Sequence, residues 1–255
     1  MSIATAKNLM TDLKLAGMID AFDRHLAQAT AEQTSYTDFF NLILQAEADH
    51  RSERKTQRRL LAAKFQGQAT LEDFDYSARR SIDKTQLKEL IGLTWLKQSR
   101  PLLLIGQTGV GKTFIAQALG RHACQHGYSV LFTTVTDWIE HLSLARATGR
   151  YLKHRDHLAR YDLLIIDNFG MRKLTTTEAQ DLCEILEERS HGKSTVFTTQ
   201  LPLTHWHEVI GDPVIADAIR DRLEHAALTL TLKGESYRSI KARKLTQHTE
   251  LASQA

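Results

Sequence analysis

The segment from Gly106 to Thr113 has the residues needed to hold phosphate groups. Its letters, GQTGVGKT, fit the pattern G-x-x-x-x-G-K-[ST]. Glycine allows backbone angles that a Cβ atom would forbid, so successive N–H groups can turn inward around phosphate oxygens. In this pattern Lys112 would reach the β- and γ-phosphates, and the Thr113 hydroxyl would bind Mg²⁺. The residues expected at this site are Gly106, Gln107, Thr108, Gly109, Val110, Gly111, Lys112, Thr113 and Phe114.

The neighbouring residues supply the context that a phosphate-binding loop requires. The apolar run LLLI at 102–105 predicts a strand before the loop, and a helix is expected to start near Lys112. The amino end of that helix would add its positive dipole to the phosphate site. A glycine-rich turn without a ligand would not need this arrangement. The sequence therefore favours nucleotide binding, with ATP and Mg²⁺ as cofactors.

A second motif follows about fifty residues later in the chain. The run LLIID at 163–167 predicts a buried strand that ends in the carboxylate of Asp167. At the carboxyl end of a parallel strand, this carboxylate would lie beside the phosphates and hold Mg²⁺ through water. Alone, the run would be an ordinary core strand. Together with the phosphate loop, it indicates the second half of a nucleotide site.

Asn168 departs from the usual pattern of such ATPases. A second acid normally follows the first aspartate and polarises the attacking water. An amide can orient water but cannot accept its proton at neutral pH. Two interpretations are open: a naturally slow switch, or an alteration that traps bound ATP. The second interpretation is favoured because the motifs around Asn168 are intact. Under either interpretation, ATP hydrolysis is in question but ATP binding is not.

Further polar residues are candidates for sensing the γ-phosphate. Gln200 follows the predicted strand STVFTT at 194–199, and we place it ahead of Thr199 as the sensor at this strand end. Arg220 and Arg222 lie in ADAIRDRLEHA, where a guanidinium could clamp a phosphate of a neighbouring molecule. An exposed helix with Arg–Asp pairs would look the same, and spacing alone does not decide between these readings.

The chain divides into a helical front part and an alternating part. Apolar residues at helical intervals predict helices over 1–66, and a looser stretch at 67–81 predicts a linker. From residue 82, short apolar runs alternate with helix-like segments, which predicts an α/β core with a parallel sheet over 82–245. Residues 246–255 are expected to form a flexible tail. The predicted strands are 102–105, 129–134, 163–167, 194–199 and 228–233.

Composition is that of an ordinary globular protein. The 255 residues are 42% hydrophobic and 25% charged, with a net charge of +3. No apolar run approaches the roughly 20 residues that span a bilayer, and the amino terminus lacks a secretory cleavage pattern. We therefore expect a cytoplasmic protein with no membrane partner. The two cysteines and twelve histidines show no zinc-ligand spacing.

Basic residues are clustered, which favours a polyanionic partner such as DNA. One group has helical spacing and forms a stripe, although such a stripe can also be a solvated helix face. A second group follows the strand at 129–134, and a pair follows Asp167. Contacts to DNA phosphates would fix the position of the protein on the duplex without recognising the base sequence. The candidates for contact with double-stranded DNA are Arg51, Arg54, Lys55, Arg58, Arg59, Arg146, Arg150, Lys153, Arg155, Arg172 and Lys173.

The chain resembles the IstB-type helper ATPases of bacterial insertion sequences, which are related to the DnaC and DnaA branch of the AAA+ superfamily. The stretches that carry the resemblance are AKFQGQATLEDFDY, LLLIGQTGVGKTFIAQALGRHACQHGYSVLFTT, LLIIDNFG, FTTQLPLTHWHEVIGDPVIADAIRDRLEHA and LKGESYR. It implies an AAA+ P-loop core after a small helical N-terminal domain that binds DNA or a partner. It also implies that Arg222 is a finger acting in trans, that Arg220 is a second contact, and that Arg238 acts near the nucleotide. The short segment after residue 234 leaves little room for a helical lid.

The resemblance implies ATP-dependent self-association on duplex DNA and activation of a cognate transposase, with a part in target selection. A helicase loader of the DnaC type is the runner-up, because it uses the same core with a different front domain. A small-molecule kinase is a third interpretation of the phosphate loop. It gives no use for Arg222 or for the basic clusters.

Overall fold

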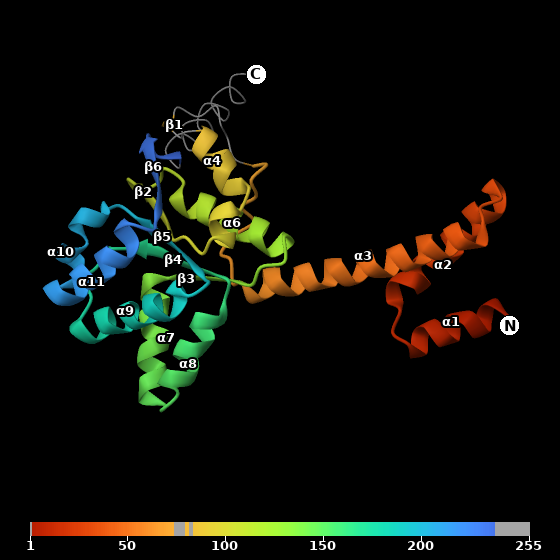
Figure 1. The fold of residues 1–255 in the computed structure, drawn as a ribbon, viewed down its shortest axis with the longest axis horizontal. Coiled ribbons are helices and arrows are strands. Elements are labelled where there is room, and N and C mark those ends of the chain that lie inside the picture. Colours follow the sequence, from red (N-terminus) through yellow and green to blue (C-terminus); the bar gives the residue numbers. More distant parts are fainter. Residues whose placement is uncertain (1, 74–79, 82–83, 238–255) are drawn as a thin grey trace, which may run out of the picture. The chain divides into compact units, whose positions relative to one another are not determined.

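The computed structural model describes residues 2–73, 80–81 and 84–237. The chain forms two compact units, residues 1–58 and 59–255 (Figure 1). The division falls inside helix α3 (Tyr36–Ala62), earlier than the expected boundary at residue 66. The reason is that Ala63 and Phe65 belong to the core of the second unit. The carbonyl of Ala63 accepts the N–H of Phe132 at 2.8 Å, and the rings of Phe65 and Phe132 lie 6.4 Å apart. The expected tail lies outside the described residues.

The first unit contains α1 (Ile3–Asp12), α2 (Ala16–Glu32) and most of α3. Its small core is built on Met18, Phe22 and Ile43, which confirms the helical periodicity read from the sequence. Helices α2 and α3 touch at Gly17, where a Cβ atom would lie 2.6 Å from the Cβ of His50. This close approach requires glycine.

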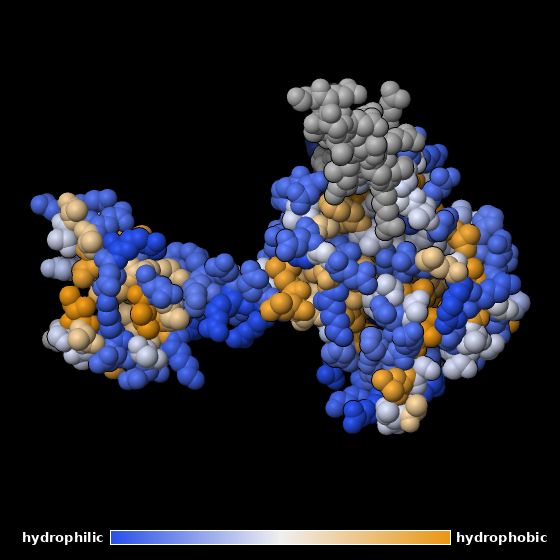
Figure 2. All heavy atoms as spheres, turned by 180° about the vertical axis from the view of Figure 1, so that it is seen from behind, coloured by the Kyte–Doolittle hydropathy of each residue, from blue (hydrophilic) through white to orange (hydrophobic). Residues whose placement is uncertain are grey.

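The surface of the first unit carries many apolar side chains, coloured orange in Figure 2. A small core leaves them outside, since a unit of this size buries little of its surface. Within the described part of the chain, no helix is both long and apolar enough to cross a bilayer. The exposed large apolar residues of this unit are Ile3, Leu9, Leu13, Tyr36, Phe40, Leu42 and Leu44.

The second unit is built on a sheet with the strand order β1-β6-β2-β5-β4-β3. Five strands are parallel, and β1 (Arg80–Ser81) pairs antiparallel with β6. This confirms the parallel sheet and every strand expected from the sequence, each to within two residues of its predicted ends. The parallel strands are β2 (Leu102–Gly106), β3 (Val130–Thr134), β4 (Leu163–Phe169), β5 (Ser194–Thr199) and β6 (Leu228–Gly234).

Helices cover both faces of the sheet because its strands are apolar on both sides. Leu102 and Leu104 join one core cluster and Leu103 the other, as the alternation of a strand requires. The first face packs against α4 (Lys84–Ile91), α5 (Thr94–Lys97) and α6 (Lys112–Gln125). The second packs against α7 (Val135–Ala147), α8 (Tyr151–Arg160), α9 (Thr176–Ser190), α10 (His207–Ile210) and α11 (Pro213–Glu224), with the short turn η1 (Leu203–His205) between β5 and α10.

Candidate active site

The loop between β2 and α6 has the backbone of a phosphate cradle. Gly109 and Gly111 have φ angles of 84° and 102°, in the left-handed region that favours glycine. Helix α6 begins directly at Lys112, so its unpaired N–H groups face the loop. The Nζ atom of Lys112 donates to the carbonyls of Gly106 at 2.8 Å and Gln107 at 2.9 Å. The ammonium group is thereby held within the loop that phosphates would occupy.

Thr113 and Asp167 meet across two elements, as the paired motifs predict. The Thr113 hydroxyl donates to Asp167 at 2.9 Å from Oδ1 and 3.1 Å from Oδ2. Burial raises the pKa of the Asp167 carboxyl, although hydrogen bonds from Thr198 and Thr113 oppose the shift. Burial also lowers the pKa of Lys112, while the nearby Asp167 charge opposes that change. A hydroxyl and a buried carboxylate are oxygen ligands of the kind that Mg²⁺ prefers, so these residues fit Mg²⁺ with a nucleotide.

Asn168 lies where strand β4 leaves its regular register with β5. The register shifts between Ile166 and Phe169, and Asn168 has a φ of 62°. Asparagine is among the few residues other than glycine that adopt this left-handed conformation readily. The backbone N–H of Asn168 donates to the hydroxyl of Thr198 at 2.9 Å. The bulge thus turns the residue after Asp167 out of the sheet.

A cavity of about 320 Å³ lies above these residues. It brings together six of the nine predicted loop residues with Asn168 and Gln200, while Gly106, Gln107 and Val110 are not in its lining. Two lining residues, Met171 and Tyr237, were not among the sequence-based candidates. Tyr237 reaches the loop because its N–H donates to the carbonyl of Gly109 at 2.9 Å. The cavity is lined by Thr108, Gly109, Gly111, Lys112, Thr113, Phe114, Asn168, Met171, Gln200 and Tyr237.

Thr198 was not among the sequence-based candidates, which were Gln200 and Thr199, yet its side chain contacts Asp167. Its hydroxyl donates to Asp167, and it is fully buried at the end of β5. Gln200 is exposed and lines the cavity. The sequence offers only a hydroxyl near the end of the predicted strand 194–199, because the pairing of this strand with the Asp167 strand is not a local pattern.

The candidate arginines of α11 are ion-paired within this chain. The Nε of Arg222 lies 2.7 Å from Glu187 of α9, and its Nη1 donates to the carbonyl of Ala218 at 2.8 Å. Arg220 pairs with Asp217 at 3.2 Å and with Glu224 at 3.6 Å. Arg238 lies outside the described residues.

The basic stripe of the first unit is largely solvent-exposed. Arg51 donates through Nε to the buried carboxylate of Glu47 at 2.6 Å, which also accepts the N–H of Met18. Arg54, Lys55 and Arg58 are exposed and enter no ion pair among the described residues. They line a shallow hollow of about 170 Å³ with Lys14, Glu47, His50 and Arg51. Arg59, at the start of the second unit, is half-buried.

In the second unit, the structure separates the basic candidates into paired and unpaired side chains. Arg146 pairs with the buried Asp181 and lies 3.8 Å from the ring centre of Tyr151. Arg155 contacts Glu184 at 3.3 Å and Glu188 at 3.6 Å. Arg172 holds Glu178 at 2.8 Å and 3.0 Å, at the start of α9. By contrast, Arg150, Lys153 and Lys173 are exposed, without an ion pair in the part of the chain that the structure describes.

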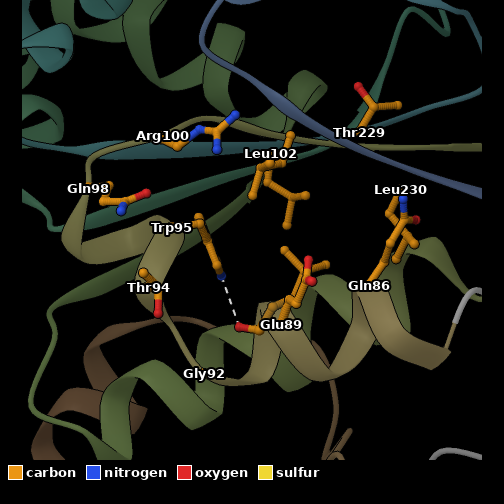
Figure 3. A pocket seen from close by; sticks show the side chains of 12 residues that line it. Gln86, Glu89, Gly92, Thr94, Trp95, Gln98, Arg100, Leu102, Thr229 and Leu230 are labelled. Atoms are coloured by element: carbon orange, nitrogen blue, oxygen red, sulfur yellow. Dashed lines mark hydrogen bonds between the residues drawn. The ribbon is translucent and has the colours of Figure 1, made fainter.

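A second hollow, of about 440 Å³, lies at the amino ends of strands β2 and β6, away from the phosphate loop (Figure 3). Its lining includes Leu102 and Leu228, the first residues of the parallel strands β2 and β6. The phosphate loop follows the other end of β2. Trp95 is fixed in its wall by an Nε1–H bond to the carbonyl of Leu90 at 2.9 Å. This hollow therefore contributes no group to the site around Lys112.

Comparison with known proteins agrees with this geometry. The family described as IstB-like ATP binding protein matches residues 8–245. The chain belongs to this family. As an IstB-like protein it is 40% identical over 235 residues to the insertion sequence ATP-binding protein y4pL of Sinorhizobium fredii, covering 92% of this chain and 96% of that protein. It is 34% identical to the insertion sequence IS21 ATP-binding protein of Pseudomonas aeruginosa, covering 94% and 92%.

Solved structures share the fold of the second unit of this IstB-like chain. The crystal structure of DnaI superposes with a TM-score of 0.57 and 19% identity, over 69% of this chain and 94% of that one. DnaA bound to AMPPCP and single-stranded DNA gives a TM-score of 0.57 with 20% identity, over 72% of this chain and 56% of that one. The core is therefore an AAA+ P-loop fold, preceded here by a helical region.

Proposed function

We propose that this chain is a transposition helper: an ATPase that assembles on duplex DNA and activates a partner transposase. The observation that carries the proposal is the contact between Thr113 and Asp167, under the glycine loop, in a chain of the IstB-like family. The insertion-sequence names of its relatives supply the context of transposition.

The site residues have distinct roles in this proposal. The loop N–H groups and Lys112 hold the β- and γ-phosphates of ATP, and Thr113 and Asp167 hold Mg²⁺. Held by these two residues, Mg²⁺ would supply positive charge that offsets the negative charge developing during hydrolysis. Gln200, which lines the cavity, senses the γ-phosphate, and Thr198 positions Asp167. Asn168 orients water but supplies no base, so turnover is slow.

Arg222 acts in trans in the assembled protein. To reach the nucleotide of a neighbour, its guanidinium has to leave Glu187, whose side chain is 53% exposed. Exposed ion pairs of this kind contribute only about 0–1 kcal/mol, so the exchange costs little. Arg220 provides a second contact, and Arg238 acts near the nucleotide as the family resemblance implies.

DNA is held through its phosphates, without base readout. The unpaired cations of the helical unit and of the segment after β3 are the contacts with the greatest freedom to bind. Arg146, Arg155 and Arg172 hold acidic side chains in place instead. Binding then weakens steeply with salt, with a log–log slope of about −0.9 for each phosphate neutralised.

A helicase loader is the second candidate, favoured by the fold shared with the DnaC helicase loader at a TM-score of 0.51. Partner specificity separates the two functions. The purified chain is mixed with ATP, duplex DNA and either a cognate transposase or a replicative helicase. We expect stimulated strand transfer by the transposase and no loading of the helicase. Helicase loading without any effect on strand transfer would contradict the proposal.

A further inference from the structure

A groove between α7 and α8 carries positive and titratable side chains on the surface of the second unit. Its volume is about 840 Å³. It is distinct from the cavity around Lys112, with which it shares no lining residue. The α7–α8 groove is lined by His141, Leu144, Ala145, Thr148, Arg150, Lys153, His154, Asp156, His157 and Arg160.

Helix α8 presents two different polar faces. On one face, Tyr151 and Arg155 contact the acidic residues of α9. The other face carries Lys153, His154, His157 and Arg160, at intervals of one, three and three residues, toward the groove. Within the described residues, Lys153 and Arg160 have no ion-pair partner. The cations that remain available therefore gather on the groove side.

The histidines of the groove lie close to one another and to further cations. The rings of His141 on α7 and His154 on α8 are 6.2 Å apart. Burial lowers the pKa of His154, and the nearby His141, His157 and Lys64 lower it further. His157 exchanges a hydrogen bond with the Tyr161 hydroxyl at 3.1 Å from Nε2. The remaining charged groups lining the groove are Arg150, Lys153, Asp156 and Arg160, and Asp156 is 3.4 Å from Arg155.

We propose that the α7–α8 groove binds the phosphodiester backbone of duplex DNA and that His154 within it takes up a proton as the DNA binds. The proposal rests on the DNA-binding function proposed above and adds a regulation to it. Because the pKa of His154 is lowered, this imidazole is mainly neutral near pH 7, and it adds little charge to the arginine and lysine side chains of the free groove. A phosphate placed beside this ring favours the imidazolium form.

The sign of the pH dependence follows from this linkage. In the free protein the pKa of His154 is below its ordinary value, whereas DNA phosphates raise it in the complex. Protons are therefore taken up on binding at a pH between the two values. The affinity for DNA rises as the pH falls through that window, and it does so more steeply than phosphate contacts by lysine and arginine alone allow.

The test measures binding of a random-sequence duplex to the full chain by fluorescence anisotropy, with a non-hydrolysable ATP analogue at fixed ionic strength. For the unaltered chain, we expect binding about tenfold tighter at about pH 6 than at about pH 8. The double variant His141→Gln/His154→Gln should lose most of this pH dependence. Lys153→Ala/Arg160→Ala should weaken binding at every pH and reduce the salt slope by about two.

Matched controls are His191→Gln and Lys97→Ala, which change exposed residues outside the groove. They should bind DNA as the unaltered chain does, and melting curves establish that each variant is folded. If the unaltered chain binds duplex DNA but the groove variants behave like the controls, the groove inference is wrong and the DNA-binding function stands. If the unaltered chain binds no duplex in any nucleotide state, both proposals fall.

Discussion

The hydroxyl of Thr198 at the end of β5 donates a hydrogen bond to the carboxylate of Asp167 on the neighbouring strand β4. The same hydroxyl accepts the backbone N–H of Asn168 at 2.9 Å. One buried side chain thus fixes both the carboxylate that faces Thr113 and the bulge that follows it. Thr198 is a positioning residue in this account, since it acts through Asp167.

Replacing Thr198 tests this positioning role. Thr198→Val keeps the shape but removes the hydroxyl, so Asp167 and the Asn168 N–H both lose a partner. We expect Mg²⁺-dependent nucleotide affinity to fall about tenfold or more, as for other groups that orient metal ligands. The free energy of unfolding should fall by about 1–3 kcal/mol. Thr198→Ser, which keeps the hydroxyl, should restore affinity. A Ser variant as defective as the Val variant would point to packing instead.

Asn168→Asp should raise ATP turnover by about a hundredfold or more, because a carboxylate can take the proton of the attacking water. Stability should change little, since asparagine and aspartate both tolerate the left-handed backbone at this position. Asn168→Val is the contrasting variant. Its β-branched side chain is strained there and should cost about 1–2 kcal/mol of unfolding free energy. Equal hydrolysis by the asparagine and aspartate forms would show that residue 168 does not activate water.

The phosphate loop, the strand ending at Asp167 and the parallel sheet were predictable because each depends on local pattern. The loop from Gly106 to Thr113 is contiguous in sequence, and a buried strand is an apolar run whichever strands it pairs with. Thr198 and Tyr237 were not predictable, because their roles depend on which strands become neighbours and on where the chain after β6 returns to Gly109. The ion pairs of Arg146, Arg155 and Arg172 also need partners distant in sequence. Charge clusters alone therefore do not show which of the basic side chains are ion-paired within the chain.

Nucleotide binding with Mg²⁺ should depend on pH through Asp167. Burial raises the pKa of this carboxyl in the folded protein, so protonation stabilises the fold at low pH and that contribution is lost as the pH rises through the folded pKa. Mg²⁺ needs the ionised form, so its binding releases a proton and strengthens as the pH rises. The increase in melting temperature caused by Mg²⁺ and nucleotide should therefore grow as the pH rises above the ordinary range of an aspartate, about pH 4. Asp167→Asn should remove this growth; an unchanged profile would exclude Asp167 as its source.

Arg222 offers a test of catalysis between subunits. Arg222→Ala should bind nucleotide normally but hydrolyse it poorly, and Lys112→Ala should fail to bind it. Mixing the two should restore part of the activity, because a Lys112→Ala subunit still supplies Arg222 to its neighbour. Asn168→Asp is included in both chains so that turnover is measurable. No recovery on mixing would mean that Arg222 does not act in trans. Glu187→Gln, which frees Arg222 from its partner, should not reduce activity.

The central claim is that ATP bound around Lys112 joins copies of this chain into an oligomer on duplex DNA. Analytical ultracentrifugation of the full chain with a random-sequence duplex tests it directly, with ATP, with ADP and with Lys112→Ala plus ATP. We predict a large protein–DNA assembly with ATP, and a smaller species with ADP or with the Lys112 variant. A chain that stays monomeric and free of DNA in all three mixtures would contradict the account.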